Sequence, residues 1–164
     1  MIRSPDLVWP AAAELGEGAW WDAAAGTILW VDILGRRVMR QRLGDGTREV
    51  WPVPETVGFA IPDTAGGLVL GLRSGLHRLR PGATVPTLML APEPHLPGNR
   101  LNDGTTDATG RLWFGSMHFE AQHPSGSLYR LEPDGTLAVA DQGYRVTNGP
   151  AISPDGRTLY HNDT

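Results

Sequence analysis

PGNRLNDGTTDATGRLWFGSM, residues 97–117, is a polar segment that leads through a tight turn into an apolar strand. The turn is predicted at Asp107–Gly110, because Asp hydrogen-bonds to its own backbone and Gly accepts positive φ. Residues 111–115 have the composition of a buried strand. We interpret the polar part as a loop that carries Arg100, Asn102 and Asp103. Binding residues usually lie on loops held by a rigid scaffold, so this loop is the first candidate site, with a plain Asn-Asp-Gly turn as the alternative.

The rest of the chain repeats the plan of this stretch. Residues 20–50, 61–90 and 105–140 each hold a glycine-containing turn, an apolar strand, a second strand, another turn and a further strand. A fourth copy begins at residue 153. Apolar side chains fall on both faces of the segment 28–33, as expected where sheets pack face to face. The sequence has no long amphipathic helical pattern, so we predict an all-β fold.

The spacing of the repeats indicates the architecture. The first turn glycines are Gly26, Gly67, Gly110 and Gly156, with separations of 41, 43 and 46 residues. A period of roughly 40–50 residues with several short strands per unit is typical of β-propeller blades. The chain holds about three and a half such units, whereas closed propellers have about 4 to 8 blades. We therefore expect residues 1–164 to form one partial β-propeller domain, truncated at its C-terminal end.

Composition narrows the possible partners and location. The chain has 14 Lys and Arg against 18 Asp and Glu, a formal net charge of −4 and no basic run. These values argue against nucleic acid and anionic membranes as partners. There is no cysteine, and residues 1–16 lack an apolar core long enough for a signal peptide. We expect a cytoplasmic protein.

Three stretches together carry a family resemblance: LGEGAWWDAAAGTILWVDI, GNRLNDGTTDATGRLWFGSM and TNGPAISPDGRTLYHNDT. In this order and spacing they resemble the gluconolactonase/regucalcin (senescence marker protein) family of six-bladed β-propellers. The resemblance runs from about Leu15 to the last residue and covers the N-terminal half of a family member. It implies a metal-dependent lactonase that hydrolyses small sugar lactones. It also implies one divalent metal ion, which can be Ca, Zn, Mn or Mg, at the mouth of the central channel.

The resemblance assigns roles to individual residues. Glu17 and Asn148 correspond to metal ligands, and Arg100, Asn102 and Glu120 to substrate-binding residues. The family's third ligand, an Asp that acts as general base, would lie beyond Thr164. No catalytic residue is therefore assigned in this chain, and we expect impaired activity.

The residues alone leave simpler readings open. Glu17 lies between Gly16 and Gly18, and on this pattern it is a solvated glutamate or an inward-pointing ligand. Asn148 precedes a glycine and a proline, as in an ordinary turn. Arg100 can form an ordinary salt bridge at the rim of the fold, and Glu120 can be an ordinary charged residue on a loop. His118, Glu120 and His123 form H-x-E-x-x-H, which is not the zinc-protease motif.

Two rival functions remain at this level: a non-enzymatic propeller that binds metal or ligand, and a half-propeller interaction module. Fold alone does not decide among them. Exposed blade faces also predict a homodimer. The tryptophans, among them Trp20, Trp21, Trp30 and Trp113, are expected to pack in the blades rather than form a ligand cage.

Overall fold

The computed structural model describes residues 5–164, so residues 1–4 of the predicted domain lie outside the described residues. The described chain consists of strands and irregular segments, with no helix, which confirms the all-β prediction. It accordingly offers no helix that could cross a membrane. The strands form three four-stranded antiparallel sheets and one two-stranded sheet.

The strands follow one another in sequence order within each sheet. The first sheet contains β1 (Gly16–Asp22), β2 (Thr27–Asp32), β3 (Arg37–Arg42) and β4 (Arg48–Pro52). The second contains β5 (Val57–Pro62), β6 (Leu68–Leu72), β7 (Gly75–Leu79) and β8 (Thr87–Leu90). The third contains β9 (Asn99–Thr106), β10 (Leu112–His118), β11 (Gly126–Leu131) and β12 (Leu137–Tyr144). The last pairs β13 (Thr147–Ile152) with β14 (Leu159–Asp163).

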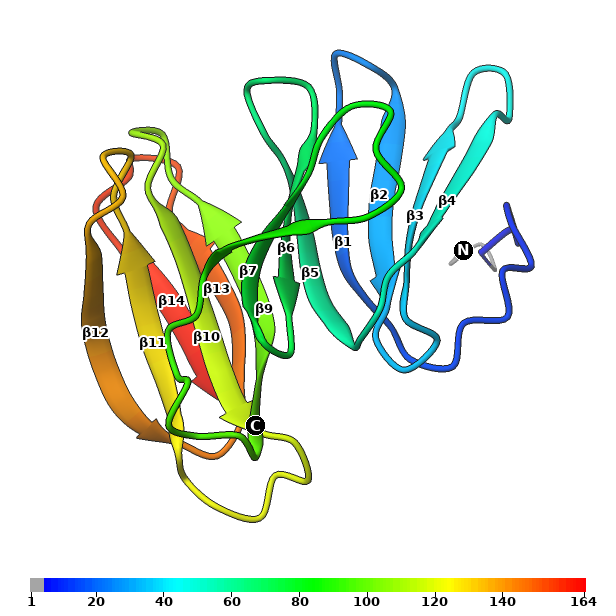
Figure 1. The fold of residues 1–164 in the computed structure, drawn as a ribbon. Helices are drawn as coiled ribbons and strands as arrows, with labels where there is room; N and C mark the ends of the chain where they lie inside the picture. The colour runs from blue at the N-terminus through cyan, green and yellow to red at the C-terminus, as the bar shows by residue number, and fades with distance from the viewer. Residues whose placement is uncertain (1–4) are drawn as a thin grey trace.

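The sheets are arranged in series, as in the blades of a propeller. Figure 1 shows them side by side, from β1–β4 at one side to β9–β12 at the other, with β13 and β14 behind. The first strand of each sheet faces the first strand of the next, since β1 contacts β5, β5 contacts β9, and β9 contacts β13. These four inner strands therefore bring together segments that are far apart in the sequence.

The predicted turn glycines lie at equivalent places, between the first and second strands of each sheet. Gly26, Gly110 and Gly156 have φ values of 61°, 83° and 70°. At the corresponding turn of the second sheet, between β5 and β6, the residue with positive φ is Gly66, at 84°, and not Gly67. The reason is the turn that starts at Asp63, whose carbonyl accepts the N–H of Gly66, just as Asp107 accepts that of Gly110.

The interpretation of residues 97–106 as a loop is wrong for all but its first two residues. Asn99–Thr106 is the inner strand β9, which pairs with β10 and packs against β5 and β13. Polar side chains on this strand suggested a loop, but Arg100, Asn102 and Asp103 line a cavity, and a strand beside such a cavity need not alternate apolar and polar residues. The strand is irregular, with a register shift opposite Phe114 and Ser116.

The core lies between successive sheets. One buried cluster, which includes Leu29, Val57 and Leu70, joins the first sheet to the second. Another joins the second to the third and holds Phe59 and Phe114, whose ring centroids are 6.3 Å apart. Full burial of one such side chain contributes roughly 1.5–3 kcal/mol, so these two clusters hold neighbouring sheets together.

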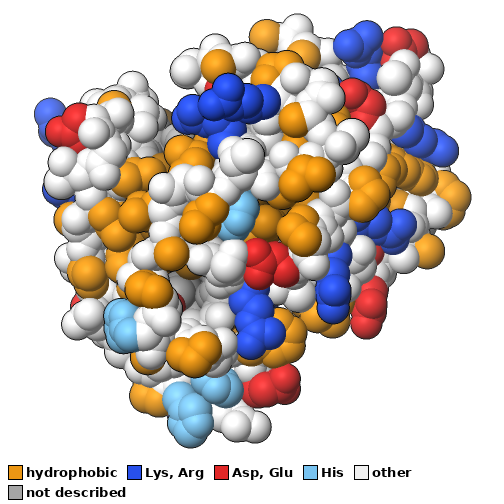
Figure 2. Space-filling model, in the orientation of Figure 1, with side chains coloured by type: hydrophobic (Ala, Val, Ile, Leu, Met, Phe, Trp, Pro, Cys, Tyr) orange, Lys and Arg blue, Asp and Glu red, His pale blue; other side chains and the backbone are white. Residues whose placement is uncertain are grey.

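Two of the tryptophans expected in the blades are exposed. Trp20 and Trp21 keep 37% and 49% of their surface accessible. Both lie on β1, an edge strand whose only paired neighbour in the described chain is β2. Tyr160 on β14 is exposed as well, and Figure 2 shows hydrophobic side chains spread over the visible face among basic and acidic groups.

Two buried carboxylates should make the fold sensitive to acid. Burial by itself would raise the pKa of Asp32, but the N–H groups of Leu15, Gly35 and Glu14 and the guanidinium of Arg37 lower it more. Asp107 also has a lowered pKa, because burial is outweighed by hydrogen bonds from the Thr109, Trp113 and Arg111 side chains and the Arg111 N–H.

A carboxylate whose pKa is lower in the folded state stabilises the fold above its unfolded pKa, about 3.9 for Asp. That stabilisation is lost as the pH falls through the folded pKa. We therefore expect the thermal midpoint, followed by circular dichroism, to fall between about pH 5 and pH 3. Asp32→Asn should show a smaller fall. A midpoint that stays constant or rises on acidification would contradict this prediction.

Candidate functional site

The two predicted metal ligands occupy matching positions on inner strands. Glu17 on β1 precedes Gly18, with φ of 60°, and Asn148 on β13 precedes Gly149, with φ of 57°. At both places the pairing with the next strand shifts register. Such bulges bend a strand and re-aim its side chains. Only glycine adopts this conformation without strain, so the X-Gly pattern directs both side chains out of the regular pleat.

Four of the five predicted site residues line one cavity of about 140 Å³, here called the Glu17 cavity. It is lined by Leu15, Glu17, Ile33, Gly58, Arg100, Asn102, Asp103, Met117, Val146 and Asn148. These residues come from β1, β5, β9, β10 and β13 and from the segments beside them. Inner strands that are distant in sequence thus converge on one polar recess.

Arg100 and Asn102 form a fixed pair within this cavity. Both are 8% exposed. The Arg100 Nη1 donates to the Asn102 Oδ1 at 2.7 Å, and the Asn102 Nδ2 donates to the carbonyl of Thr147 at 2.8 Å. β9 is thereby tied to β13 beside Asn148. Gly58 permits this approach, because a Cβ there would lie 2.3 Å from the carbonyl oxygen of Asn102.

Asp103 stabilises two segments, its own strand and the bulge at Gly149. Its Oδ1 accepts the N–H of Gly104 at 2.8 Å, and its Oδ2 accepts that of Gly149 at 2.9 Å. Burial raises the pKa of Asp103, although these two hydrogen bonds and the nearby His161 partly offset the rise. The carboxylate therefore links β9 to the bulge that positions Asn148.

The electrostatics of the cavity centre on one pair of opposite charges. Burial lowers the pKa of Arg100, while the charge of Glu17 raises it again. Among residues 5–164, the Glu17 carboxylate accepts no hydrogen bond and forms no salt bridge. Glu17 thus faces Arg100 across the cavity but keeps its oxygens available.

The donor set suits a divalent cation that prefers oxygen. The Glu17 carboxylate and the Asn148 amide oxygen are hard donors, which Ca²⁺, Mg²⁺ and Mn²⁺ favour. The only hydrogen bond of the Asn148 amide group within the described chain is donation by Nδ2 to the Thr164 Oγ1 at 3.4 Å. Residues 5–164 contain no group of three His, Cys, Asp or Glu side chains close enough to hold a metal. Two protein donors would leave several coordination positions for water or substrate.

Glu120 is the predicted site residue that does not reach this cavity. It is exposed, in the turn after β10, and its N–H donates to the Nδ1 of His118 at 3.3 Å. The turn is tight because Ala121 adopts a φ of 52° and donates its N–H to the carbonyl of His118. The rings of His118 and His123 pack edge to face, 4.8 Å apart.

Sequence reasoning missed a second cavity of about 420 Å³ that adjoins the first at Arg100. We call it the Arg73 cavity and define it by Glu55, Arg73, Ser74, Glu93, Asn99 and Arg100 among its lining residues. Arg73 lies in the turn between β6 and β7. The repeat pattern could have pointed to it, because this turn corresponds to the β10–β11 connection that carries Glu120.

Glu93 was missed as well, and no sequence signal identifies it. Its carboxylate accepts hydrogen bonds from the Ser116 Oγ at 2.6 Å, the Tyr129 hydroxyl at 2.8 Å and the Asn99 Nδ2 at 2.9 Å. The segment before β9 is thus anchored to the third sheet, directly beside Arg100.

Comparison with known proteins gives consistent relatives. An L-arabinolactonase of Azospirillum brasilense is 38% identical over 156 residues, which are 92% of this chain and 51% of that protein. A 6-deoxy-6-sulfogluconolactonase of Pseudomonas putida is 31% identical over 164 residues, 100% of this chain and 54% of that protein. The chain thus spans about half the length of the curated relatives it matches.

Solved structures agree with this placement. The calcium-binding protein regucalcin from Agrobacterium tumefaciens superposes with a TM-score of 0.88 at 31% identity, covering 96% of this chain and 53% of that one. A gluconolactonase from Xanthomonas campestris has a TM-score of 0.76 at 29% identity, covering 93% of this chain and 55% of the other. The family described as SMP-30/Gluconolactonase/LRE-like region matches residues 15–164. This chain therefore belongs to the SMP-30/gluconolactonase/LRE-like family.

Proposed function

We propose that the protein hydrolyses small sugar lactones with the help of one divalent metal ion. The observation that carries this proposal is the convergence of Glu17, Arg100, Asn102 and Asn148 on one cavity. The relatives named as lactonases support the reaction class. Because the chain spans about half the length of these relatives, the activity of the whole protein is part of the proposal.

Four of the lining residues would have defined tasks in this reaction. The Glu17 carboxylate and the Asn148 amide oxygen would hold the ion, which when bound polarises a lactone carbonyl and lowers the pKa of a bound water. Arg100 presents a planar fork of donors to the oxygens of the lactone. Asn102, fixed by Thr147, orients that fork. No residue among 5–164 is assigned as general base.

The test is a lactone hydrolysis assay on D-glucono-1,5-lactone and L-arabino-1,4-lactone, with and without a chelator. Hydrolysis that the chelator abolishes and a divalent ion restores would support the proposal. Hydrolysis that is insensitive to chelator would refute the metal dependence. No hydrolysis above the spontaneous rate would refute the enzymatic function.

A propeller that binds metal without catalysis is the second candidate, favoured by the relative described as a calcium-binding protein. Calorimetric titration with Ca²⁺ distinguishes it, since this function predicts binding without turnover. The predicted homodimer, the absence of nucleic-acid and membrane partners and the cytoplasmic location stay predictions.

A further inference from the structure

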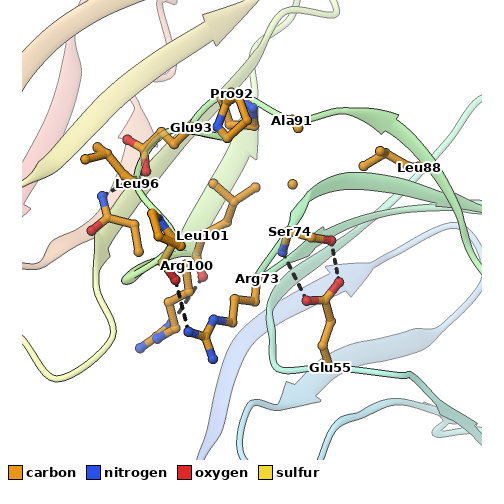
Figure 3. Close-up of a pocket in the computed structure, with 14 residues that line it drawn as sticks. Glu55, Arg73, Ser74, Leu88, Ala91, Pro92, Glu93, Leu96, Arg100 and Leu101 are labelled. Atoms are coloured by element: carbon orange, nitrogen blue, oxygen red, sulfur yellow. Dashed lines mark hydrogen bonds between the residues drawn. The ribbon is translucent and has the colours of Figure 1, made fainter.

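Two guanidinium groups share one aromatic ring at the Arg73 cavity. The Cζ of Arg73 lies 5.2 Å from the ring centroid of Phe119, and that of Arg100 lies 6.0 Å from it. Arg73 is also fixed by donation from its Nη2 to the carbonyl of Pro97 at 3.0 Å. Figure 3 shows both guanidinium groups at the same end of the cavity. Two positive charges are thus held close together on rigid supports.

Within the described chain neither arginine has a carboxylate partner. The two acids of the cavity point elsewhere in Figure 3. Glu55 accepts both the N–H and the hydroxyl of Ser74. Glu93 is engaged with Ser116, Tyr129 and Asn99 in the way described above. The arginine end of the cavity therefore has no contacting carboxylate among the described residues, although the charge of Glu17 acts on Arg100 from the neighbouring Glu17 cavity.

The cost of this arrangement falls mainly on Arg100, which is 8% exposed. Its hydrogen bonds within the described residues use Nη1 alone, so the donors on Nε and Nη2 remain for another acceptor. A buried cation without a contacting anion is unfavourable, and Glu17 offsets this cost only in part, because the pKa of Arg100 remains lowered. An anion placed between the two guanidiniums would relieve this cost and receive charge-assisted hydrogen bonds.

We propose that Arg73 and Arg100 form a subsite for an anionic group on the end of the substrate that is remote from the lactone carbonyl. Arg100 lines both cavities, so a lactone ring in the Glu17 cavity can extend its side chain into the Arg73 cavity. The preferred substrate is then a sugar lactone with a terminal carboxylate, sulfonate or phosphate. This inference rests on the proposed lactonase function.

The experiment compares two lactones that differ at one position, D-glucaro-1,4-lactone with a terminal carboxylate and D-glucono-1,4-lactone with a terminal hydroxyl. The measured quantity is the ratio of their kcat/KM values. We expect Arg73→Gln to lower this ratio about 10- to 100-fold, since the lost hydrogen bonds are made to a charged group. Arg73→Lys should retain part of the preference, because it keeps the charge without the fork.

Arg80→Gln is the matched control. Arg80 lies just after β7, at the opposite end of that strand from Arg73, is exposed and makes no side-chain hydrogen bond within residues 5–164. The control changes net charge equally, so its ratio should match the wild type. An equal effect of Arg73→Gln on both lactones would mean that Arg73 only braces the Pro97 segment, and would overturn the inference.

A binding measurement separates this inference from the lactonase proposal. Calorimetric titration with D-gluconate, which ends in a carboxylate, and D-glucitol, which has a hydroxyl in its place, needs no turnover. Tighter binding of gluconate that Arg73→Gln removes would support the subsite even if no lactone is hydrolysed. Equal binding of the two compounds by the wild-type protein would overturn it even if both lactones are hydrolysed.

Discussion

Glu17→Gln should lower the kcat/KM for lactone hydrolysis at least about 100-fold, because a bound ion contributes several kcal/mol of charge stabilisation in the transition state. Glutamine keeps the shape of the side chain and one oxygen donor but removes the negative charge. The affinity for the divalent ion should fall with the rate. Initial-rate assays and calorimetric metal titration measure the two effects independently.

The same substitution should leave the stability of the fold nearly unchanged. The Glu17 carboxylate is exposed and has no hydrogen bond or salt bridge within residues 5–164. Glu14→Gln is the matched control, since Glu14 is also exposed and does not line the Glu17 cavity. A Glu17→Gln protein with near wild-type rate and metal affinity would contradict the assigned role. A large fall in its melting temperature would instead indicate a structural role.

Much of the fold followed from the sequence, because the physical signals that specify turns are local. Each turn between the first and second strands of a sheet contains an Asp whose carboxylate accepts an N–H two residues later and a glycine with positive φ. Both residue types can be identified directly in the sequence, so the repeats could be counted. The assignment of β9 failed because its strand character depends on partners. Asn99–Thr106 is held by β10, which follows it along the chain, and by β5 and β13, which lie further away in the sequence.

The sequence predicted only those site residues that lie in short family motifs. Glu17, Arg100, Asn102 and Asn148 were predicted from the family resemblance, and the structure brings them to one cavity. Arg73 and Glu93 act through contacts with residues far along the chain, such as Phe119 and Tyr129. Such contacts depend on how the repeats pack against one another, and no local sequence pattern predicts this packing.

Glu93→Ala should destabilise the fold by about 2–4 kcal/mol, because it leaves several buried donors without their acceptor. Tyr129 and Asn99, both 5% exposed, would each lose a hydrogen bond to the carboxylate. Burial and this hydrogen bond both raise the pKa of the Tyr129 phenol, so it stays a donor at neutral pH. The Ser116 hydroxyl loses the same acceptor. Urea denaturation measures the change in the free energy of unfolding.

The chemistry of the replacement decides how large this effect is. Glu93→Gln keeps an oxygen for Ser116 and Tyr129 but turns a donor toward the Asn99 Nδ2, so we expect a loss of about 1 kcal/mol. Glu55→Ala is the control, because Glu55 lines the same cavity but accepts only from the exposed Ser74. We expect this control to cost less than about 1 kcal/mol. Equal losses for Glu93→Ala and Glu55→Ala would show that the buried network adds no stability.

Glu93→Ala should also raise the KM for lactones, because Glu93 holds Asn99, which is next to Arg100. An unchanged KM would show that the hydrogen bonds of Glu93 do not affect substrate binding.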